Sequence, residues 1–387
     1  MKPSDPKNLI HPKQPKFVYD IKKSWEKVVQ EGPVWLSNKF PSLPREKKYS
    51  FLGHKLISPI AISAGPASRK IWTDFYLKMG YGMVLEKTRR STPRPSNKVP
   101  NVAIIQAEEQ VSRQSLNKPL TATNDQNEFD KYQSITNSFG NPSPSLEVWA
   151  QELRKQRESV KDGQILGCSV TATTPGDNQG CSVIFGKSPS EALIVETAED
   201  LLIAATAAVT SGAQFIEFNL ACPNVTENPE EGEMFQSADL VKYLFSEFKR
   251  RFPNTKAGFK FGLYKNKNQM KKVFKAPGKN LDYVSGINAI AMTVLGKDGK
   301  EILPGRKTSG VCGKLIQDIA LESIKWANQI RKEEGLKYEI LGGGGIVEVS
   351  DVDKFLKAGA DMVQIATIAM VDPLFVYKYR FYNSSKL

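Results

Sequence analysis

Histidine is nearly absent from this chain of 387 residues, which contains only His11 and His54. Histidine is the side chain that most often serves as a general base near neutral pH, and it is also a common metal ligand. Because both histidines lie close to the N-terminus, a Ser/His/Asp triad or a histidine-rich metal site in the body of the chain is disfavoured. Any proton transfer is therefore expected from a thiol, a hydroxyl, a lysine or a carboxylate.

Cysteine is scarce as well, and Cys168, Cys181, Cys222 and Cys312 are scattered with no Cys-x-x-Cys pair. This spacing argues against a disulfide framework, a zinc ribbon and a cysteine-ligated iron–sulfur cluster, so we predict no bound metal. The Gly-x-Gly-x-x-Gly pattern of nicotinamide-binding proteins is also missing.

Long apolar runs are missing too, since no stretch approaches the roughly 20 residues that a membrane-spanning helix needs. The start of the chain lacks the apolar core of a secretion signal. We therefore predict an intracellular, cytoplasmic protein with no membrane span.

The composition is that of a folded protein with an excess of positive charge. Hydrophobic residues make up 40% of the chain and charged residues 25%, which is enough apolar material for a sizeable core. The net charge of +13 raises nucleic acid as a partner. The charges form only short clusters typical of solvated faces, so nucleic acid is disfavoured, whereas an anionic substrate or a cofactor phosphate fits equally well.

Strand-like apolar runs alternate with helix-like periodic stretches, which is the pattern of repeated βα units. The predicted strands are 59–63, 83–87, 164–170, 215–219, 257–261, 289–294, 338–341 and 362–366. Eight such units predict an α/β fold, a closed (β/α)8 TIM barrel, in which the carboxyl ends of the strands carry the chemistry.

Two segments fall outside this repeat, an N-terminal extension over 1–50 and a long insertion over 89–147 within the barrel domain 51–387. In the extension, Ile21, Trp25, Val28 and Val29 lie at helical spacing and predict a short helix that ends at Gly32. The helix is either a clasp packed on the barrel or an amphipathic element for a membrane or a partner, and its shortness favours the clasp. The insertion has the length of a functional loop or lid.

The densest cluster of chemistry is the stretch 219–224, which follows the strand 215–219. It places two amides, Asn219 and Asn224, and the thiol of Cys222 in six residues at a strand end. A thiol with an ordinary pKa of about 8.5 becomes a usable base once its thiolate is favoured. The alternative is that Cys222 is a small buried apolar residue.

Further polar candidates are expected at the same end of the barrel. Asn137 offers a donor and an acceptor beside Gly140, although this loop alone is also typical of a turn. Lys87 and Lys260 end two strands and would face a bound anion or a reduced flavin, or else pair with carboxylates. The four glycines at 342–345 either leave backbone NH groups open to a phosphate, which their place after the seventh strand favours, or form a flexible turn.

Together these motifs resemble the dihydroorotate dehydrogenase family, over about residues 50 to 375. The matching motifs are 219–224, 137–140, Lys87 with Lys260, Cys312-Gly313 and 344–346. The resemblance implies a barrel that binds FMN, a role in pyrimidine biosynthesis and a homodimer. It also implies that Cys222 is the general base that removes a proton from dihydroorotate while hydride passes to flavin N5, as in the soluble class whose members use cysteine.

The resemblance also implies two sets of binding residues. Those expected around the substrate are Lys87, Asn137, Ser138, Phe139, Gly140, Asn219, Asn224 and Thr293. Those expected around FMN are Ser63, Ala64, Gly65, Lys87, Thr88, Ser169, Asn219, Lys260, Thr293, Gly313, Gly343, Gly344, Gly345, Ala366 and Thr367.

Some positions depart from the family pattern. Family members carry Asn and then Ser or Thr after the sixth strand, and an alignment on Gly296 puts Thr293 and Val294 there. A ligand edge would then be left without polar partners. Cys312 and Ala221 also replace frequent serines. We therefore expect that FMN binding is retained and that the substrate is altered to a related cyclic compound.

Two other functions stay open. A dihydrouridine-synthase-like RNA-modifying flavoenzyme would suit the positive charge, but those enzymes carry a histidine beyond the fifth strand that is missing here. A flavin-binding protein without turnover is the second alternative. The electron acceptor is unknown and is a small molecule, a quinone or a separate subunit.

Overall fold

An eight-stranded parallel barrel forms the centre of the computed structural model, which describes residues 5–37, 39–173, 189–222 and 234–384. The strands pair in the closed order β10-β11-β14-β15-β3-β4-β8-β9. Their bounds are β3 (Ile60–Ile62), β4 (Met83–Arg89), β8 (Ile165–Val170), β9 (Phe215–Asn219), β10 (Lys256–Lys260), β11 (Tyr283–Gly286), β14 (Glu339–Gly343) and β15 (Met362–Ile365). The predicted (β/α)8 barrel is confirmed.

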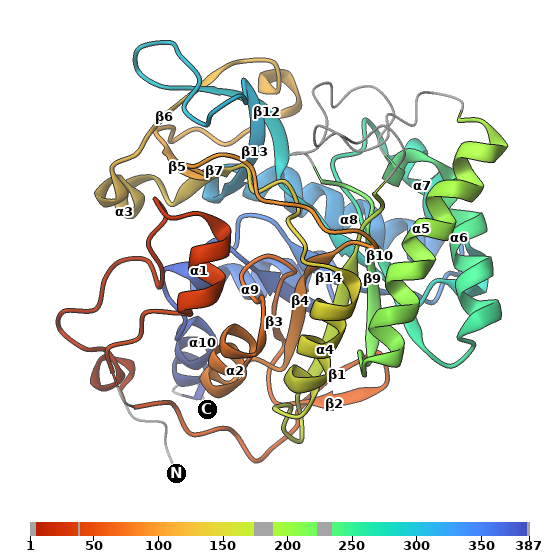
Figure 1. Cartoon of the computed structure of the whole chain (residues 1–387), viewed down its shortest axis with the longest axis horizontal. Helices are drawn as coiled ribbons and strands as arrows, with labels where there is room; N and C mark the ends of the chain where they lie inside the picture. The colour runs from red at the N-terminus through yellow and green to blue at the C-terminus, as the bar shows by residue number, and fades with distance from the viewer. Residues whose placement is uncertain (1–4, 38, 174–188, 223–233, 385–387) are drawn as a thin grey trace.

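Helices cover the outside of the barrel (Figure 1). They are α2 (Lys70–Met79), α4 (Leu146–Arg157), α5 (Glu191–Thr210), α6 (Ala238–Arg251), α7 (Lys267–Lys275), α8 (Gln317–Glu333), α9 (Val349–Ala358) and α10 (Phe375–Ser384). Helix α6 begins after Ser237, whose side chain accepts a hydrogen bond from Leu240 N, and it buries Leu244 and Phe248 on one face. Each such apolar side chain contributes about 1.5–3 kcal/mol when fully buried. None of the helices in the described ranges is long and apolar enough to cross a membrane.

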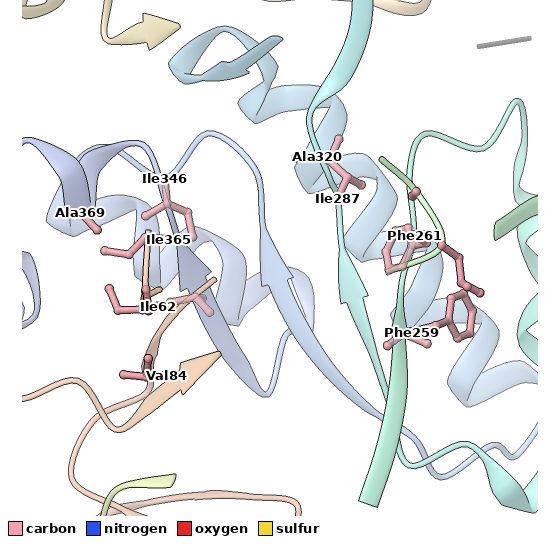
Figure 2. Close-up of a cluster of buried hydrophobic side chains, with 14 of the residues drawn as sticks. Ile62, Val84, Phe259, Phe261, Ile287, Ala320, Ile346, Ile365 and Ala369 are labelled. Atoms are coloured by element: carbon pink, nitrogen blue, oxygen red, sulfur yellow. The ribbon is translucent and has the colours of Figure 1, made fainter. Parts of the chain in front are cut away.

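Side chains of the barrel strands alternate between two apolar layers. Ile62, Val84 and Ile365, from three neighbouring strands, lie together on the outer face toward the helices (Figure 2). Met83 and Tyr283 belong to a second cluster that fills the amino-terminal half of the barrel. Because this second cluster fills only the amino-terminal half of the barrel interior, polar side chains can occupy the interior at the carboxyl ends of the strands.

A second, smaller closed barrel stands above the first (Figure 1). Its strand order is β12-β13-β7-β5-β6. The bounds are β5 (Val102–Ile105), β6 (Leu120–Thr123), β7 (Ser134–Asn137), β12 (Ile290–Leu295) and β13 (Thr308–Gly313). The predicted insertion 89–147 supplies β5, β6, β7 and the short helix α3 (Phe129–Tyr132), so the insertion is a folded element.

The predicted sixth barrel strand was wrong. The run 289–294 forms β12 of the small barrel, and the sixth strand of the main barrel is the shorter β11, Tyr283–Gly286. Burial explains the error, because β11 is buried throughout, whereas β12 alternates between buried and half-buried residues, as expected for a sheet with one covered face. The run 289–294 is longer than 283–286, but its alternation fits the small barrel better than a parallel strand buried on both faces.

The N-terminal extension packs against the barrel. It contains the 3-10 helix η1 (Pro6–Leu9) and helix α1 (Trp25–Glu31), and the hairpin β1 (Tyr49–Phe51) and β2 (His54–Leu56) follows it. Val18 N donates to Met370 O at 2.8 Å, and Trp72 Nε1 on α2 donates to Val28 O at 3.3 Å. The apolar stripe of α1 thus faces the protein, as the clasp interpretation expects.

Candidate active site

A cavity of about 200 Å³ opens at the carboxyl ends of the barrel strands. Most of the predicted site residues line it. These are Cys222, Lys87, Asn137, Phe139, Gly140, Asn219, Ser63, Ala64, Gly65, Lys260, Gly313, Gly343, Gly344, Gly345, Ala366 and Thr367. They come from both barrels, since Asn137 lies on β7 and Gly313 on β13. The small barrel therefore forms one wall of the cavity.

Four predicted residues do not line the cavity. Thr88 and Ser169 lie behind its wall, where Thr88 Oγ1 is 3.2 Å from Ser169 Oγ. Ser138 Oγ accepts hydrogen bonds from Asn97 and Arg306 and so fixes the Asn137 loop. Thr293 pairs with Thr308 in the small barrel, away from the cavity. A fifth predicted residue, Asn224, lies outside the described residues.

The amide of Asn219 is held in one orientation at the end of β9. Its Nδ2 donates to Thr88 Oγ1 at 3.0 Å, and its Oδ1 accepts from Asn288 Nδ2 at 3.2 Å. Asn288 also donates to the backbone oxygen of Ala221, the residue before Cys222. These contacts fix the backbone from which the Cys222 thiol projects.

Asn288 was missed because the sixth strand was misplaced. It follows β11 directly and lines the cavity with Ala289. The signal was an asparagine two residues after the short run Tyr283–Gly286. Counted from the observed sixth strand, the positions at which the resemblance implies Asn and then Ser or Thr fall on Asn288 and Ala289, and alanine has no hydroxyl. The substrate argument from Thr293 and Val294 loses its basis.

Lys260 is held by a buried carboxylate. Its Nζ lies 2.9 Å from Glu217 Oε1 and 3.1 Å from Ser63 Oγ, and the Lys260 and Glu217 side chains are 4% and 0% exposed. Ser169 Oγ donates to the same Glu217 oxygen at 2.9 Å. Lys260 therefore enters the cavity as part of an ion pair.

Lys87 is buried with a weaker partner. Its Nζ lies 3.5 Å from Asn141 Oδ1. Burial lowers the pKa of Lys87 to about 8, Cys222 opposes this shift, and the positive charges of Arg89, Lys260 and Arg90 add to it. Lys87 is thus an ammonium that can lose its proton just above neutral pH.

The glycine loop after β14 packs closely on the start of α8. Gly344 and Gly345 have φ angles of 110° and 86°, and a Cβ on Gly345 would lie 2.6 Å from Gln317 Cα. Only glycine fits this conformation and this contact. The loop and the first turn of a 17-residue helix therefore meet beside the cavity, an arrangement that suits an anion.

Two cysteines reach the cavity. Cys222 is partly exposed, whereas burial raises the pKa of Cys312, which accepts a hydrogen bond from Asn137 Nδ2 at 3.5 Å. Cys168 is buried away from the cavity, and Cys181 lies outside the described residues. Within the described ranges no group of three or more His, Cys, Asp or Glu side chains could hold a metal ion.

The N-terminal extension also contributes to the cavity wall, which was not predicted from the sequence. The contributing residues are Tyr19, Trp25, Val28 and Val29, beside Trp72 of α2. Helical spacing predicted that Trp25, Val28 and Val29 share one apolar face of a helix, but no spacing indicates which cavity such a face lines.

Comparisons with known proteins agree with this arrangement. The family model described as dihydroorotate dehydrogenase matches residues 122–379. Dihydroorotate dehydrogenase of Dictyostelium discoideum is 31% identical, over 96% of this chain and 98% of that protein. Dihydroorotate dehydrogenase A (fumarate) of Limosilactobacillus reuteri is 30% identical over 43% of this chain and 51% of that protein.

Two further proteins extend the comparison. The catalytic subunit of dihydroorotate dehydrogenase B (NAD(+)) from Thermodesulfovibrio yellowstonii is 28% identical over 43% of this chain and 52% of that protein. The Eimeria tenella DHODH crystal structure in complex with ferulenol superposes with a TM-score of 0.64 at 15% identity, covering 89% of this chain and 86% of that one, which supports the fold. With a family model that matches most of the chain and a relative aligned over nearly all of it, the chain belongs to the dihydroorotate dehydrogenase family.

Proposed function

We propose that this chain is an FMN-dependent dihydroorotate dehydrogenase in which Cys222 is the general base. The observation that carries the proposal is the convergence of Cys222, Asn219, Asn288 and Lys260 on one cavity, with a glycine loop beside it. This set combines a base, amides for a planar ring, a cation and an anion cradle. Dihydroorotate dehydrogenase chemistry needs each of these parts.

The described residues fit FMN. The glycine loop and the start of α8 would hold the phosphate, and Gly313 and Thr367 lie on the same cavity. Lys260 is the cation placed to offset negative charge on a flavin ring, and Ser63 holds its ammonium from the end of β3. FMN, when bound, supplies the acceptor for hydride at its N5 atom.

Cys222 would remove the proton from the carbon next to the one that loses hydride. It is partly exposed at the cavity, whereas Cys168 is fully buried and cannot reach a ligand there. The Asn288 contact to the Ala221 backbone keeps the thiol in place. Positioning of this kind lets one base contribute about 10²- to 10⁴-fold to the rate.

The amides would orient the ring of the substrate. Asn137, Asn219 and Asn288 each carry a donor and an acceptor, and a cyclic imide presents alternating acceptors and donors along its edge. Lys87 adds a positive charge for the carboxylate that dihydroorotate carries. Because Asn288 supplies the amide after strand six, the substrate we propose is dihydroorotate itself. Ala289 weakens its binding through one missing hydroxyl.

The test begins with the purified protein. We expect the absorbance of bound FMN and its bleaching when dihydroorotate is added without oxygen. Reoxidation is then compared among fumarate, NAD⁺ and a short-chain quinone. Cys222→Ala is the matched variant, because it should keep the FMN spectrum and lose the bleaching. A colourless protein that FMN cannot reconstitute would contradict the proposal.

A further inference from the structure

The buried carboxylate of Glu217 has no role in the mechanism above, although it lies directly below the cavity. On β9, Glu217 and Asn219 are two residues apart and point to the same side, into the barrel. Asn219 lines the cavity, so Glu217 is one layer deeper. Its neighbours across the sheet are Ser169 on β8 and Gly258 on β10.

Glu217 is bound through only one of its two oxygens. Oε1 accepts from Lys260 and from Ser169, each at 2.9 Å, whereas Oε2 is buried with no hydrogen-bond partner among the described residues. A fully buried carboxylate with an unpaired oxygen is costly. Replacing a buried ion pair with apolar residues is often neutral or stabilising, so fold stability alone does not account for this pair.

Lys260 connects this carboxylate to the cavity. Its Nζ contacts Glu217 on one side and Ser63 on another, and both Lys260 and Ser63 line the cavity. The position of the ammonium and the net charge felt above it therefore depend on Glu217. A carboxylate 2.9 Å from an ammonium cancels much of its field at longer range.

We propose that Glu217 is a positioning residue that holds the Lys260 ammonium at the cavity and offsets part of its charge, and so sets how strongly the site favours reduced FMN. The inference rests on the proposed function, because it needs a flavin in the cavity. It concerns a residue that does not itself touch the flavin, since Glu217 is buried below the residues that line the cavity.

The sign of the effect follows from the charges. Without the carboxylate, the positive charge of Lys260 at the cavity loses the negative charge that lies 2.9 Å from it. The uncompensated charge then stabilises an electron-rich flavin more strongly. Removing the carboxylate should therefore make the bound FMN easier to reduce.

The test is a double-mutant cycle on the two-electron reduction potential of the bound FMN, measured at pH 7 by equilibration with a reference dye. We expect Glu217→Gln to raise the ratio of reduced to oxidised FMN at least tenfold at a fixed ambient potential, which is about 30 mV for a two-electron couple. Lys260→Met should lower the ratio at least tenfold. A buried carboxylate that has lost its cation is neutralised by a proton, so in the Lys260→Met background Glu217→Gln should change the ratio less than threefold.

Asp282→Asn is the matched control. Asp282 pairs with Lys249 and Lys256 at the other end of the barrel, so its loss also breaks an ion pair but leaves the cavity unchanged. It should change the ratio less than threefold. The inference is overturned if Glu217→Gln changes the ratio less than threefold, or by equal factors in both backgrounds.

If the Glu217→Gln variant fails to fold or to bind FMN, melting temperatures of the other variants still test the inference. Lys260→Met leaves a buried carboxylate without its cation, so the double variant should melt at a higher temperature than Lys260→Met alone. A double variant that melts below Lys260→Met would overturn the inference. If the unmutated protein binds no FMN, the proposed function fails, and that result is distinct from an unchanged potential in a yellow protein.

Discussion

Two lysines reach the same cavity from different barrel strands, and their partners differ. Lys260 of β10 lies 2.9 Å from the Glu217 carboxylate, whereas Lys87 of β4 lies 3.5 Å from the neutral amide of Asn141. None of the ion pairs between described residues includes Lys87. The same side chain in the same cavity is thus held as an ion pair on one strand and as an unpaired, titratable cation on another.

The difference shows how one barrel can assign two tasks to one residue type. A lysine fixed by a carboxylate keeps its position and presents a moderated charge, which suits a permanent cofactor. A lysine without a carboxylate keeps its full charge for an incoming anion, at the cost of a pKa lowered to about 8. We therefore assign Lys260 to FMN and Lys87 chiefly to the substrate.

The largest expected effect comes from removing the proposed base, Cys222, which lies on the same cavity as both lysines. Cys222→Ala should lower the rate constant of FMN reduction by dihydroorotate by about 10²- to 10⁴-fold. Bound FMN and its reduction potential should stay as in the unmutated protein, because the thiol is not part of the Lys260–Glu217 ion pair. Stopped-flow absorbance measures the rate. A variant that reduces FMN at an unchanged rate would remove Cys222 from the mechanism.

Substitutions of the two lysines should affect different kinetic constants. Lys260→Met should lower the rate constant of FMN reduction by about 10²-fold, since it removes electrostatic stabilisation of the reduced state. Lys87→Met should mainly raise the substrate concentration needed for half-maximal reduction. Single-turnover kinetics over a range of dihydroorotate concentrations distinguish the two. Identical profiles for both variants would contradict the division of roles.

Stability as a function of pH tests the unpaired state of Lys87. Its pKa in the folded chain is about 8, below the ordinary lysine value of 10.5, so the unfolded chain binds more protons between these two values. The free energy of unfolding should therefore rise between pH 8 and 10.5, by up to about 3 kcal/mol. Urea unfolding at several pH values measures this rise, and Lys87→Met should remove it.

Asn141→Asp would make Lys87 resemble Lys260. The new carboxylate should raise the pKa of Lys87 and remove most of the pH-dependent rise, a change of about 1–3 kcal/mol. Asn141 has a φ of 49°, a conformation that aspartate also tolerates, so the backbone should not change. An unchanged pH dependence in this variant would show that Lys87 does not titrate as assigned.

The smallest expected effect is at Ala289. Ala289→Ser restores a hydroxyl beside Asn288 and should lower the dissociation constant of dihydroorotate about 3- to 10-fold, since one hydrogen bond contributes about 0.5–1.5 kcal/mol. Titration of the flavin spectrum in the inactive Cys222→Ala background measures it. An unchanged dissociation constant after this substitution would mean that Ala289 does not face the substrate.

Strong periodic segments were predictable from the sequence alone. The bounds of β9 agree with the predicted strand 215–219, because a short apolar run bounded by turn residues leaves few alternatives. Lys87, Lys260 and Cys222 could be placed at the cavity because parallel strands bring their carboxyl ends together.

Contacts between distant segments were not predictable. Strand β11 is short and ends in Ser285-Gly286, so the longer apolar run 289–294 was predicted as the sixth strand instead. Asn288 was then not recognised as a residue that follows a barrel strand. The pairing of Glu217 with Lys260 depends on the register between β9 and β10, and no single sequence shows that register. Helix α7 is hard to recognise in the sequence because its lysine-rich segment has few apolar residues, although Met270 and Phe274 are buried at helical spacing.

The most direct test of the account is an anaerobic titration of the purified protein with dihydroorotate, followed by the absorbance of bound FMN. We predict a yellow protein whose FMN is fully reduced by dihydroorotate, and a Cys222→Ala variant that stays oxidised over the same period. A yellow protein whose FMN is not reduced by dihydroorotate would contradict the substrate, and equal bleaching of the variant would contradict the base.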